Sequence, residues 1–216
     1  MENKYFVGSF STGKDSAFAL YQAMQAGLKP MALFITYHPE IGRAWFHGVT
    51  ESVILRLSNA LELPIHLIET GGADYEERFE EKLVQFQKEG AAFCVFGDID
   101  IEAHLQWDKV RCEAAGLKAY FPLWKMDRKQ VVYRLIDSGF VAMITTVDTE
   151  RLPASYLGKQ LTKELLKDLE KEGVDICGEN GEYHTLVTGG PIFRHTFTYT
   201  IGNPVFDGRY AKLPVW

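Results

Sequence analysis

The stretch that decides the fold is Tyr5-Phe6-Val7-Gly8-Ser9-Phe10-Ser11-Thr12-Gly13-Lys14-Asp15-Ser16, near the start of a chain of 216 residues. An apolar run, Tyr5 to Phe10, leads into a turn of small polar residues, and a helical pattern begins at Ala17. A strand that delivers such a turn to a helix N-terminus presents unpaired backbone N–H groups and the positive end of the helix dipole. The segment therefore predicts an oxyanion-binding loop, with nucleotide phosphates as the leading ligand.

The side chains of the turn support phosphate binding. Lys14 supplies a cation, and Ser11, Thr12 and Ser16 supply hydroxyl donors. Asp15 is placed either to cap the helix or to hold a Mg2+ ion that bridges phosphates. The same stretch nearly fits the Walker pattern G-x-x-x-x-G-K-[ST], but Asp15 stands where that pattern needs a hydroxyl for the metal. An ordinary strand-to-helix turn rich in small residues is the structural alternative.

The turn resembles the pyrophosphate loop, Ser-Gly-Gly-Lys-Asp-Ser, of the N-type ATP pyrophosphatases. Thr12 replaces the first glycine of that pattern. The resemblance implies that the loop holds ATP by its β- and γ-phosphates together with Mg2+.

Composition restricts the class of protein. With 46% hydrophobic residues and a formal net charge of -6, the chain has enough apolar residues for a full core and shows no basic stripe for a nucleic-acid duplex. The segment Met1 to Lys4 lacks the features of a secretory signal, and no apolar run approaches bilayer length. Three cysteines without C-x-x-C spacing fit a reducing compartment. We expect a cytoplasmic protein without a membrane partner.

Strand and helix patterns alternate from residue 1 to residue 122, which predicts an α/β fold with a parallel sheet and helices on both of its faces. Ligands of such sheets bind beyond the carboxyl ends of the strands, where the phosphate loop lies. The expected strands are Tyr5 to Phe10, Met31 to Tyr37, Ile65 to Ile68, Ala92 to Phe96 and Tyr120 to Phe121.

The pattern changes after Pro122, so we predict an ATP-binding domain at residues 1–122 and a smaller α+β domain at residues 123–216. The second part is expected to hold helices from about Asp127 to Ser138 and Leu157 to Glu172, and strands at Val141 to Val147, Thr185 to Val187, Thr196 to Ile201 and Val205 to Phe206.

A second polar segment, Cys177-Gly178-Glu179-Asn180-Gly181-Glu182-Tyr183-His184-Thr185, gathers carboxylates, an amide, an imidazole and a hydroxyl around two glycines. Such a loop suits Mg2+ binding, orientation of an amine or acid–base chemistry. A solvated glycine-rich hairpin is the alternative from these residues alone.

Residues Gly178 to Thr185 resemble the Gly-Glu-x-Gly-Glu-[Phe/Tyr]-x-[Thr/Ser] segment of the diphthine–ammonia ligase family. Other motifs in the family's order are the pyrophosphate loop, Gly97-Asp98-Ile99, Phe121-Pro122-Leu123-Trp124 and Leu157-Gly158. The resemblance implies a HUP-type N-terminal domain and a C-terminal domain whose Glu-rich loop faces the ATP cleft. It also implies cleavage of ATP to AMP and pyrophosphate, coupled to amidation by ammonia of diphthine, a modified histidine of elongation factor 2.

We therefore expect an amide ligase that adenylates a carboxylate before ammonia or an amine attacks. The catalytic residues would be Lys14, Asp15, Glu179, Glu182 and His184, with Glu179 and Glu182 positioning the acceptor or ammonia, His184 moving a proton and Asp15 on the metal. The ATP-binding residues would be Ser11, Thr12, Gly13, Lys14, Asp15, Ser16, Phe34, Ile35, Thr36, Gly97 and Asp98. Gly97 is expected to let the ligand approach the backbone, and Phe34 to Thr36 to receive adenine and ribose.

Two alternatives stay open: an ATP-binding sensor of the universal-stress type, which would not cleave ATP, and a pyrophosphatase with another acceptor, such as a tRNA-thiolating enzyme. The segment Asp100 to Trp107 differs from the Ser- and Gln-containing stretch of defined ligases, so the acceptor is not predicted. His38 and His47 are interpreted as surface-loop residues, and a homodimer is left open.

Overall fold

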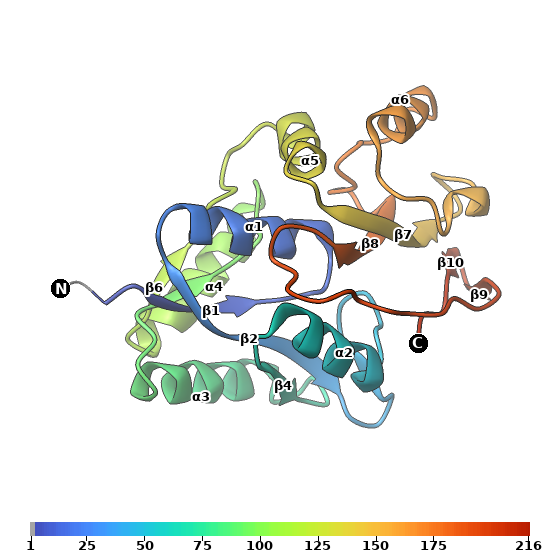
Figure 1. The fold of residues 1–216 in the computed structure, drawn as a ribbon. Helices are drawn as coiled ribbons and strands as arrows, with labels where there is room; N and C mark the ends of the chain where they lie inside the picture. Colours follow the sequence, from blue (N-terminus) through green and yellow to red (C-terminus); the bar gives the residue numbers. More distant parts are fainter. Residues whose placement is uncertain (1–2) are drawn as a thin grey trace.

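The computed structural model describes residues 3–216, so Met1 and Glu2 of the segment considered for a targeting signal lie outside the described residues. Its larger sheet has six strands: five follow the order β3-β2-β1-β5-β6, and β4 also pairs with β2. Figure 1 shows β4 beside β2. All of its pairings are parallel except that of the short β3. The strands are β1 (Tyr5–Ser9), β2 (Lys29–His38), β3 (Arg43–Ala44), β4 (Ile65–Glu69), β5 (Phe93–Val95) and β6 (Lys118–Tyr120).

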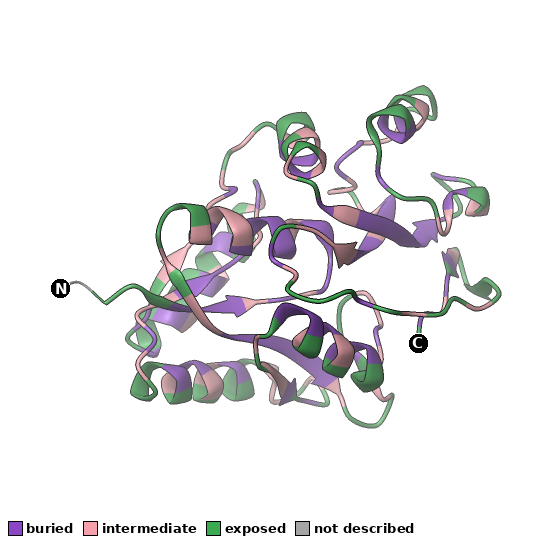
Figure 2. Cartoon of the chain, viewed as in Figure 1, coloured by how far each residue is buried: buried purple, intermediate pink, exposed green. Residues whose placement is uncertain are grey.

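Helices cover both faces of this sheet. Helices α1 (Lys14–Gln25) and α2 (Glu51–Leu61) pack on one face, and α3 (Tyr75–Lys88) and α4 (Glu102–Ala114) pack on the other. Figure 2 shows the buried residues on the sheet and on the inner sides of the helices. Because both faces are covered, β1 sends Phe6 into one core and Val7 into the other, which explains its continuous apolar run. The predicted α/β class is confirmed.

A second, antiparallel sheet follows, with strand order β8-β7-β10-β9. Its strands are β7 (Val141–Asp148), β8 (Tyr183–Gly189), β9 (Val205–Asp207) and β10 (Tyr210–Lys212). The other elements of this part are α5 (Arg128–Asp137), a 3-10 turn (Ala154–Tyr156) and α6 (Lys163–Lys171). The expectation of a smaller α+β part after the parallel sheet is confirmed, and the domain boundary after residue 122 stays a prediction.

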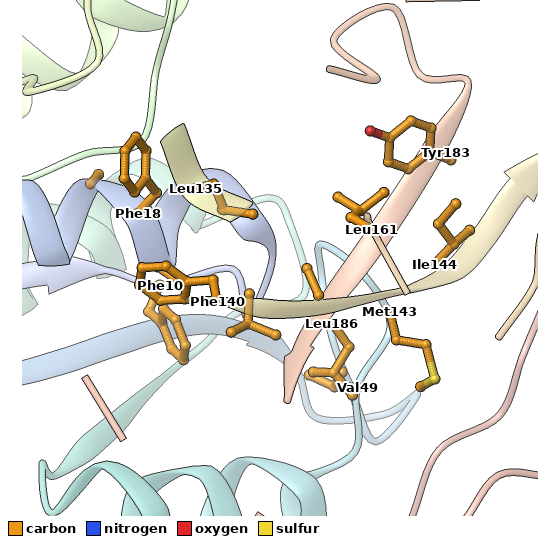
Figure 3. Packing of buried hydrophobic residues seen from close by; sticks show 14 of the residues in the cluster. Phe10, Phe18, Val49, Leu135, Phe140, Met143, Ile144, Leu161, Tyr183 and Leu186 are labelled. Atoms are coloured by element: carbon orange, nitrogen blue, oxygen red, sulfur yellow. The ribbon is translucent and has the colours of Figure 1, made fainter. Parts of the chain in front are cut away.

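The two sheets share one hydrophobic core. Phe140, immediately before β7, packs edge-on against Phe18 and Tyr21 of α1, at ring-centroid distances of 6.2 and 5.7 Å. Figure 3 shows Phe10, Phe18 and Phe140 in the same cluster as Met143 and Leu186 of the second sheet. The halves are therefore joined by apolar packing rather than by a solvated linker.

Three sequence expectations about elements are corrected. Helix α1 begins at Lys14 instead of Ala17, so the end of the phosphate loop is the first helical turn. Helix α6 begins at Lys163 instead of Leu157, because Gly158, Lys159 and Leu161 hydrogen-bond to β7 and Thr162 caps the helix. Residues 196–200 form no strand and Ile201 makes only an isolated bridge to Val215.

Among residues 3–216, no helix combines the length and the apolar character that crossing a membrane requires.

Candidate active site

A cavity of about 520 Å3 lies where the carboxyl ends of β1 and β5 meet the second sheet. Its walls include the phosphate loop, the segment after β5, and the Glu-rich segment with the start of β8. The residues that line it are Ser9, Ser11, Lys14, Asp15, Ser16, Phe46, His47, Tyr75, Phe79, Phe96, Gly97, Asp98, Ile99, Ile101, His104, Trp107, Asp108, Gly178, Glu179, Gly181, Tyr183, His184 and Thr185. The two polar segments singled out from the sequence thus share one cavity.

The phosphate loop is built at the N-terminus of α1. Gly13 is the N-cap residue, and the Ser16 hydroxyl donates to its carbonyl oxygen at 3.0 Å. The Lys14 backbone N–H donates to the Thr185 hydroxyl oxygen at 3.0 Å, which links the loop to β8. First-turn N–H groups and the helix dipole make this end of α1 suited to an anion.

Thr12 adopts a left-handed backbone conformation, with φ of 72°. This conformation is strained for a β-branched residue, which explains why the pyrophosphate-loop pattern has glycine here. The Thr12 carbonyl accepts a hydrogen bond of 2.9 Å from the Val187 N–H of β8, which helps to hold the strained turn. Thr12 is fully buried, so it does not line the cavity by its side chain.

Lys14 is buried between two carboxylates. Its Nζ lies 2.6 Å from Asp15 Oδ2 and 3.5 Å from Glu179 Oε1. Burial disfavours the ammonium, but Asp15 and further negative neighbours outweigh that effect, so the pKa of Lys14 stays well above its ordinary value. Burial and the nearby Asp15 raise the pKa of Glu179 to about 7. The cavity therefore combines a permanent cation with a carboxyl group that titrates near neutral pH.

Asp15 and Glu179 fit a divalent cation. With Cys177, they place potential ligand atoms within 4.8 Å of one another, and Asp15 Oδ1 is buried without a hydrogen-bond partner among the described residues. Mg2+ prefers oxygen ligands. Burial raises the pKa of the Cys177 thiol far above its ordinary value, so Cys177 stays protonated and only the two carboxylates suit the ion.

Two imidazole rings lie together at one wall of the cavity. The rings of His47 and His184 have centroids 5.0 Å apart, and His47 Nδ1 lies 2.8 Å from the Thr185 carbonyl oxygen. Burial and then the neighbouring His184 lower the pKa of His47 to about 3, so the neutral ring donates from Nδ1 to Thr185 and leaves Nε2 as an acceptor. Burial also lowers the pKa of His184. His47 therefore lines the cavity and contacts β8, which corrects its interpretation as a surface-loop histidine.

The carboxyl groups of Asp98 and Asp108 form a pair inside the same cavity. Burial and the adjacent Asp98 raise the pKa of Asp108 to about 9, so Asp108 holds a proton at neutral pH and hydrogen-bonds Asp98. His104 Nδ1 lies 3.4 Å from Asp98 Oδ1. Asp108 was not among the predicted site residues. A signal existed in the sequence, because it shares one buried stripe of α4 with Leu105 and Cys112.

Gly97 has a packing role in addition to the ligand approach that the sequence predicts. A Cβ atom at this position would lie 2.8 Å from the Ser16 backbone nitrogen and 2.9 Å from the Asp15 carbonyl carbon. The absence of a side chain therefore lets the first turn of α1 approach the end of β5, in addition to opening the cavity wall.

The cavity has an aromatic end, formed by Tyr75, Phe79, Phe96 and Trp107. The rings of Phe79 and Trp107 pack edge to face, with centroids 4.9 Å apart. The structure does not bring the predicted trio of Phe34, Ile35 and Thr36 to this lining.

Phe34, Ile35 and Thr36 instead make packing contacts and sheet hydrogen bonds. Phe34 packs against Phe79 and Phe86, and Ile35 lies in the opposite core. The Thr36 carbonyl accepts a hydrogen bond from the Trp45 N–H beside β3. Strand β2 continues to His38, so these residues are not at its end.

Glu182 also differs from expectation. Its carboxylate accepts hydrogen bonds from the Asn180 backbone N–H, the Asn180 side-chain amide and the Asp175 N–H at 3.1 to 3.3 Å. It is buried and does not line the cavity. Its hydrogen bonds place Glu182 inside the loop that presents Glu179, and its contact with substrate stays a prediction.

Arg128, at the start of α5, holds this loop against the segment after β5. It donates two hydrogen bonds to the Asp100 carboxylate, at 2.6 and 2.8 Å, one to Asp175 at 2.6 Å and one to Asn180 at 3.2 Å. A forked guanidinium can satisfy such separated acceptors, which a lysine cannot. Residues 175–180 are therefore tied to the N-terminal half.

Comparisons with known proteins agree with the motif resemblance. The diphthine–ammonia ligase of Danio rerio is 30% identical over 97% of this chain and 91% of its own length. The human diphthine–ammonia ligase is 25% identical over 95% of this chain and 86% of its own length. The Schizosaccharomyces pombe diphthine–ammonia ligase is 27% identical over 90% of this chain, which spans 36% of that protein's length.

Among solved structures, a protein described as a predicted subunit of tRNA methyltransferase from Methanocaldococcus jannaschii matches with a TM-score of 0.47 and 14% identity, over 88% of this chain and 98% of its own. Family models match both parts of the chain: residues 6–119 match the diphthamide synthase N-terminal domain, and residues 127–206 match the diphthamide synthase C-terminal domain. The chain belongs to the diphthamide synthase family.

Proposed function

We propose that this protein is an ATP-dependent amide ligase that forms AMP and pyrophosphate, adenylates a carboxylate and transfers the acyl group to ammonia or an amine. Its relatives are diphthine–ammonia ligases, which makes diphthine the first acceptor to test. The observation that carries the proposal is the single cavity lined by both Lys14 of the phosphate loop and Glu179 of the Glu-rich loop.

In this proposal the triphosphate lies along Ser11 to Ser16, against the N-terminus of α1. The nucleobase occupies the aromatic end of the cavity, where Trp107 and Tyr75 offer ring faces and edges. Asp15 and Glu179 would hold Mg2+, which would neutralise phosphate charge. Lys14 stabilises the negative charge that develops on pyrophosphate as it leaves.

The reaction then proceeds in two balanced steps. A carboxylate oxygen of the acceptor attacks the α-phosphorus, and the bond to pyrophosphate breaks. Ammonia next attacks the acyl carbon, AMP leaves, and one proton of the nitrogen passes to a base. His184 suits that base, because its lowered pKa keeps the imidazole neutral and able to accept a proton. Glu182 and Arg128 act as positioning residues for the loop that carries Glu179.

Two broader expectations belong to the same proposal. Cys94, Cys112 and Cys177 are all free and buried, which supports a reducing, cytoplasmic setting. Self-association into a homodimer is testable by light scattering. The universal-stress-type sensor is the weaker alternative, because the described site pairs the phosphate loop with a second polar loop that ATP binding alone does not need.

The test is product analysis with α-labelled ATP, Mg2+, ammonium and elongation factor 2 that carries diphthine. We expect labelled AMP, pyrophosphate and amidated acceptor in equal amounts. Labelled ADP with orthophosphate, or ATP bound but unchanged, would contradict the proposal.

The variant Lys14→Met separates the roles of charge and packing in the same assay. It keeps much of the apolar stem but removes the ammonium, so we expect AMP formation to fall at least about 100-fold, the loss typical of one lost charge-stabilising group. Lys171→Met is the matched control, since Lys171 is exposed, pairs with Asp168 and does not line the cavity. Equal rates for both variants would remove Lys14 from the mechanism.

A further inference from the structure

A second cavity, of about 750 Å3, lies beside the first and shares two residues of its lining with it. Its walls come from the segment between β2 and α2, from β7 and β8, and from the C-terminal strands. The residues that line it are His38, Ile41, Arg43, Ala44, Trp45, His47, Gly48, Val49, Thr145, Thr146, His184, Leu186, Val205, Phe206, Asp207, Tyr210, Lys212, Leu213, Pro214 and Val215.

His47 and His184 are the two described residues that line both cavities. The paired rings therefore form the partition between them. His184 projects from β8, immediately before Thr185, whose hydroxyl oxygen accepts the Lys14 N–H bond at the phosphate loop. A ligand in the second cavity that reaches this partition is thus next to the wall of the phosphate site.

The volumes argue for two separate ligands. Cavities that hold one small ligand run from about 300 to about 1,000 Å3, and each of these two falls within that range. A nucleotide that extends from the aromatic end to the phosphate loop occupies the first cavity along its length. The acceptor needs its own space, open to the α-phosphate from one side.

The chemistry of the second cavity matches an organic carboxylate with an apolar body. Leu186, Val49 and Leu213 provide apolar wall, while His38 Nδ1 is buried without a hydrogen-bond partner among the described residues. Lys212 is paired with Asp207 at 2.6 Å. Arg43 donates to the Gly48 carbonyl and forms no ion pair within residues 3–216, so it leaves a net positive charge at the wall.

We propose that the second cavity is the acceptor site, and that the acceptor carboxylate approaches the nucleotide at the wall that His47 and His184 form between the two cavities. Arg43 attracts the anionic acceptor, and the neutral imidazoles offer no ion pair that would hold the carboxylate away from the nucleotide. This inference rests on the proposed function for the identity of its ligand, but its location is tested by binding alone.

The experiment blocks the second cavity with a bulky label attached at its exposed edge. Ile41 lines this cavity and is 64% exposed, so Ile41→Cys can be labelled with a bulky maleimide without disturbing the core. The native cysteines are all buried, which directs the reagent to the new thiol. Leu55→Cys is the matched control, because Leu55 on α2 is 63% exposed and lines neither cavity.

Calorimetric titration with two probes, free diphthine and diphthine-bearing elongation factor 2, measures the affinity of the acceptor site. Titration with MgATP reads the nucleotide site. We expect labelled Ile41→Cys to bind at least one probe ten-fold or more weakly than labelled Leu55→Cys, with MgATP affinity unchanged within two-fold.

Equal probe binding by the two labelled proteins would overturn the assignment, as would the absence of probe binding to unlabelled protein or a parallel loss of MgATP affinity. AMP formation by labelled Leu55→Cys reports separately on the proposed function, so failure of the reaction and failure of the site are distinguished.

Discussion

Asp108 is a carboxyl group held in the protonated state by its surroundings. In the folded protein its pKa is about 9, against an ordinary value of 3.8, because the group is buried and faces Asp98. The folded state therefore keeps a proton that the unfolded chain releases above about pH 4. Between these two pKa values, folding stability falls as the pH rises.

Asp108→Asn removes this dependence while its amide still offers a donor to Asp98. We expect the variant to be more stable than the parent protein at pH 8, with a gain that is smaller at pH 5 and absent near pH 3. Thermal unfolding across this pH range measures the effect. Equal melting temperatures for the two proteins at pH 8 would show that Asp108 is not protonated in the fold.

At the scale of single residues, the sequence predicts chemistry better than orientation. Lys14, Asp15 and Glu179 meet in the cavity, and the sequence identified all three because each lies in a recognisable local motif. The sequence does not distinguish Glu179 from Glu182. Glu179 lines the cavity, whereas the Glu182 carboxylate accepts hydrogen bonds from Asn180 inside the loop. His47 gives no local signal, since its burial depends on β8, more than a hundred residues further along the chain.

At the scale of elements, the distance between α1 and β5 is set by Gly97. Gly97→Ala would place a methyl group against the backbone of Asp15 and Ser16, where no flexible side chain can move away. We expect a loss of about 1 to 3 kcal/mol in the free energy of unfolding, the usual cost of overpacking, together with weaker ATP binding because the first turn of α1 is displaced.

Chemical denaturation and ATP titration measure these two effects. Gly71→Ala is the control, since a Cβ there meets nothing within 4 Å and the backbone has no positive φ. If Gly97→Ala behaved like Gly71→Ala, close helix approach would not be the reason for the glycine.

Element prediction succeeded where short-range patterns decide the outcome. The buried runs of β1 and β2 and the helical periods of α2 to α5 are local properties, so the alternation of the first half could be read from the sequence. The start of α6 could not, because Leu157 and Leu161 stand at helical spacing, whereas the backbone from Gly158 to Leu161 hydrogen-bonds to β7. The two-residue β3 also depends on a partner strand rather than on its own pattern.

At the scale of the whole molecule, the shared core predicts that the two sheets unfold together. Phe140 is 4% exposed and contacts Phe18 and Tyr21 across the junction. We expect Phe140→Ala to lower the free energy of unfolding by about 3 to 5 kcal/mol, as large-to-small core substitutions do, within one cooperative transition.

Circular dichroism and tryptophan fluorescence should give the same midpoint for this variant. Phe206→Ala is the control, because Phe206 is 65% exposed and its truncation should change stability little. Two separated transitions would show that the halves are energetically independent.

The hydrogen bond from the Val187 N–H of β8 to the Thr12 carbonyl means that the turn before α1 takes part of its shape from a strand more than 170 residues further along the chain. A chimaera that grafted residues 1–122 onto an unrelated module would lose this brace and leave a strained threonine without its support. We therefore expect members of the family to inherit the turn before α1 and strand β8 together, whereas exposed residues outside this pair can vary.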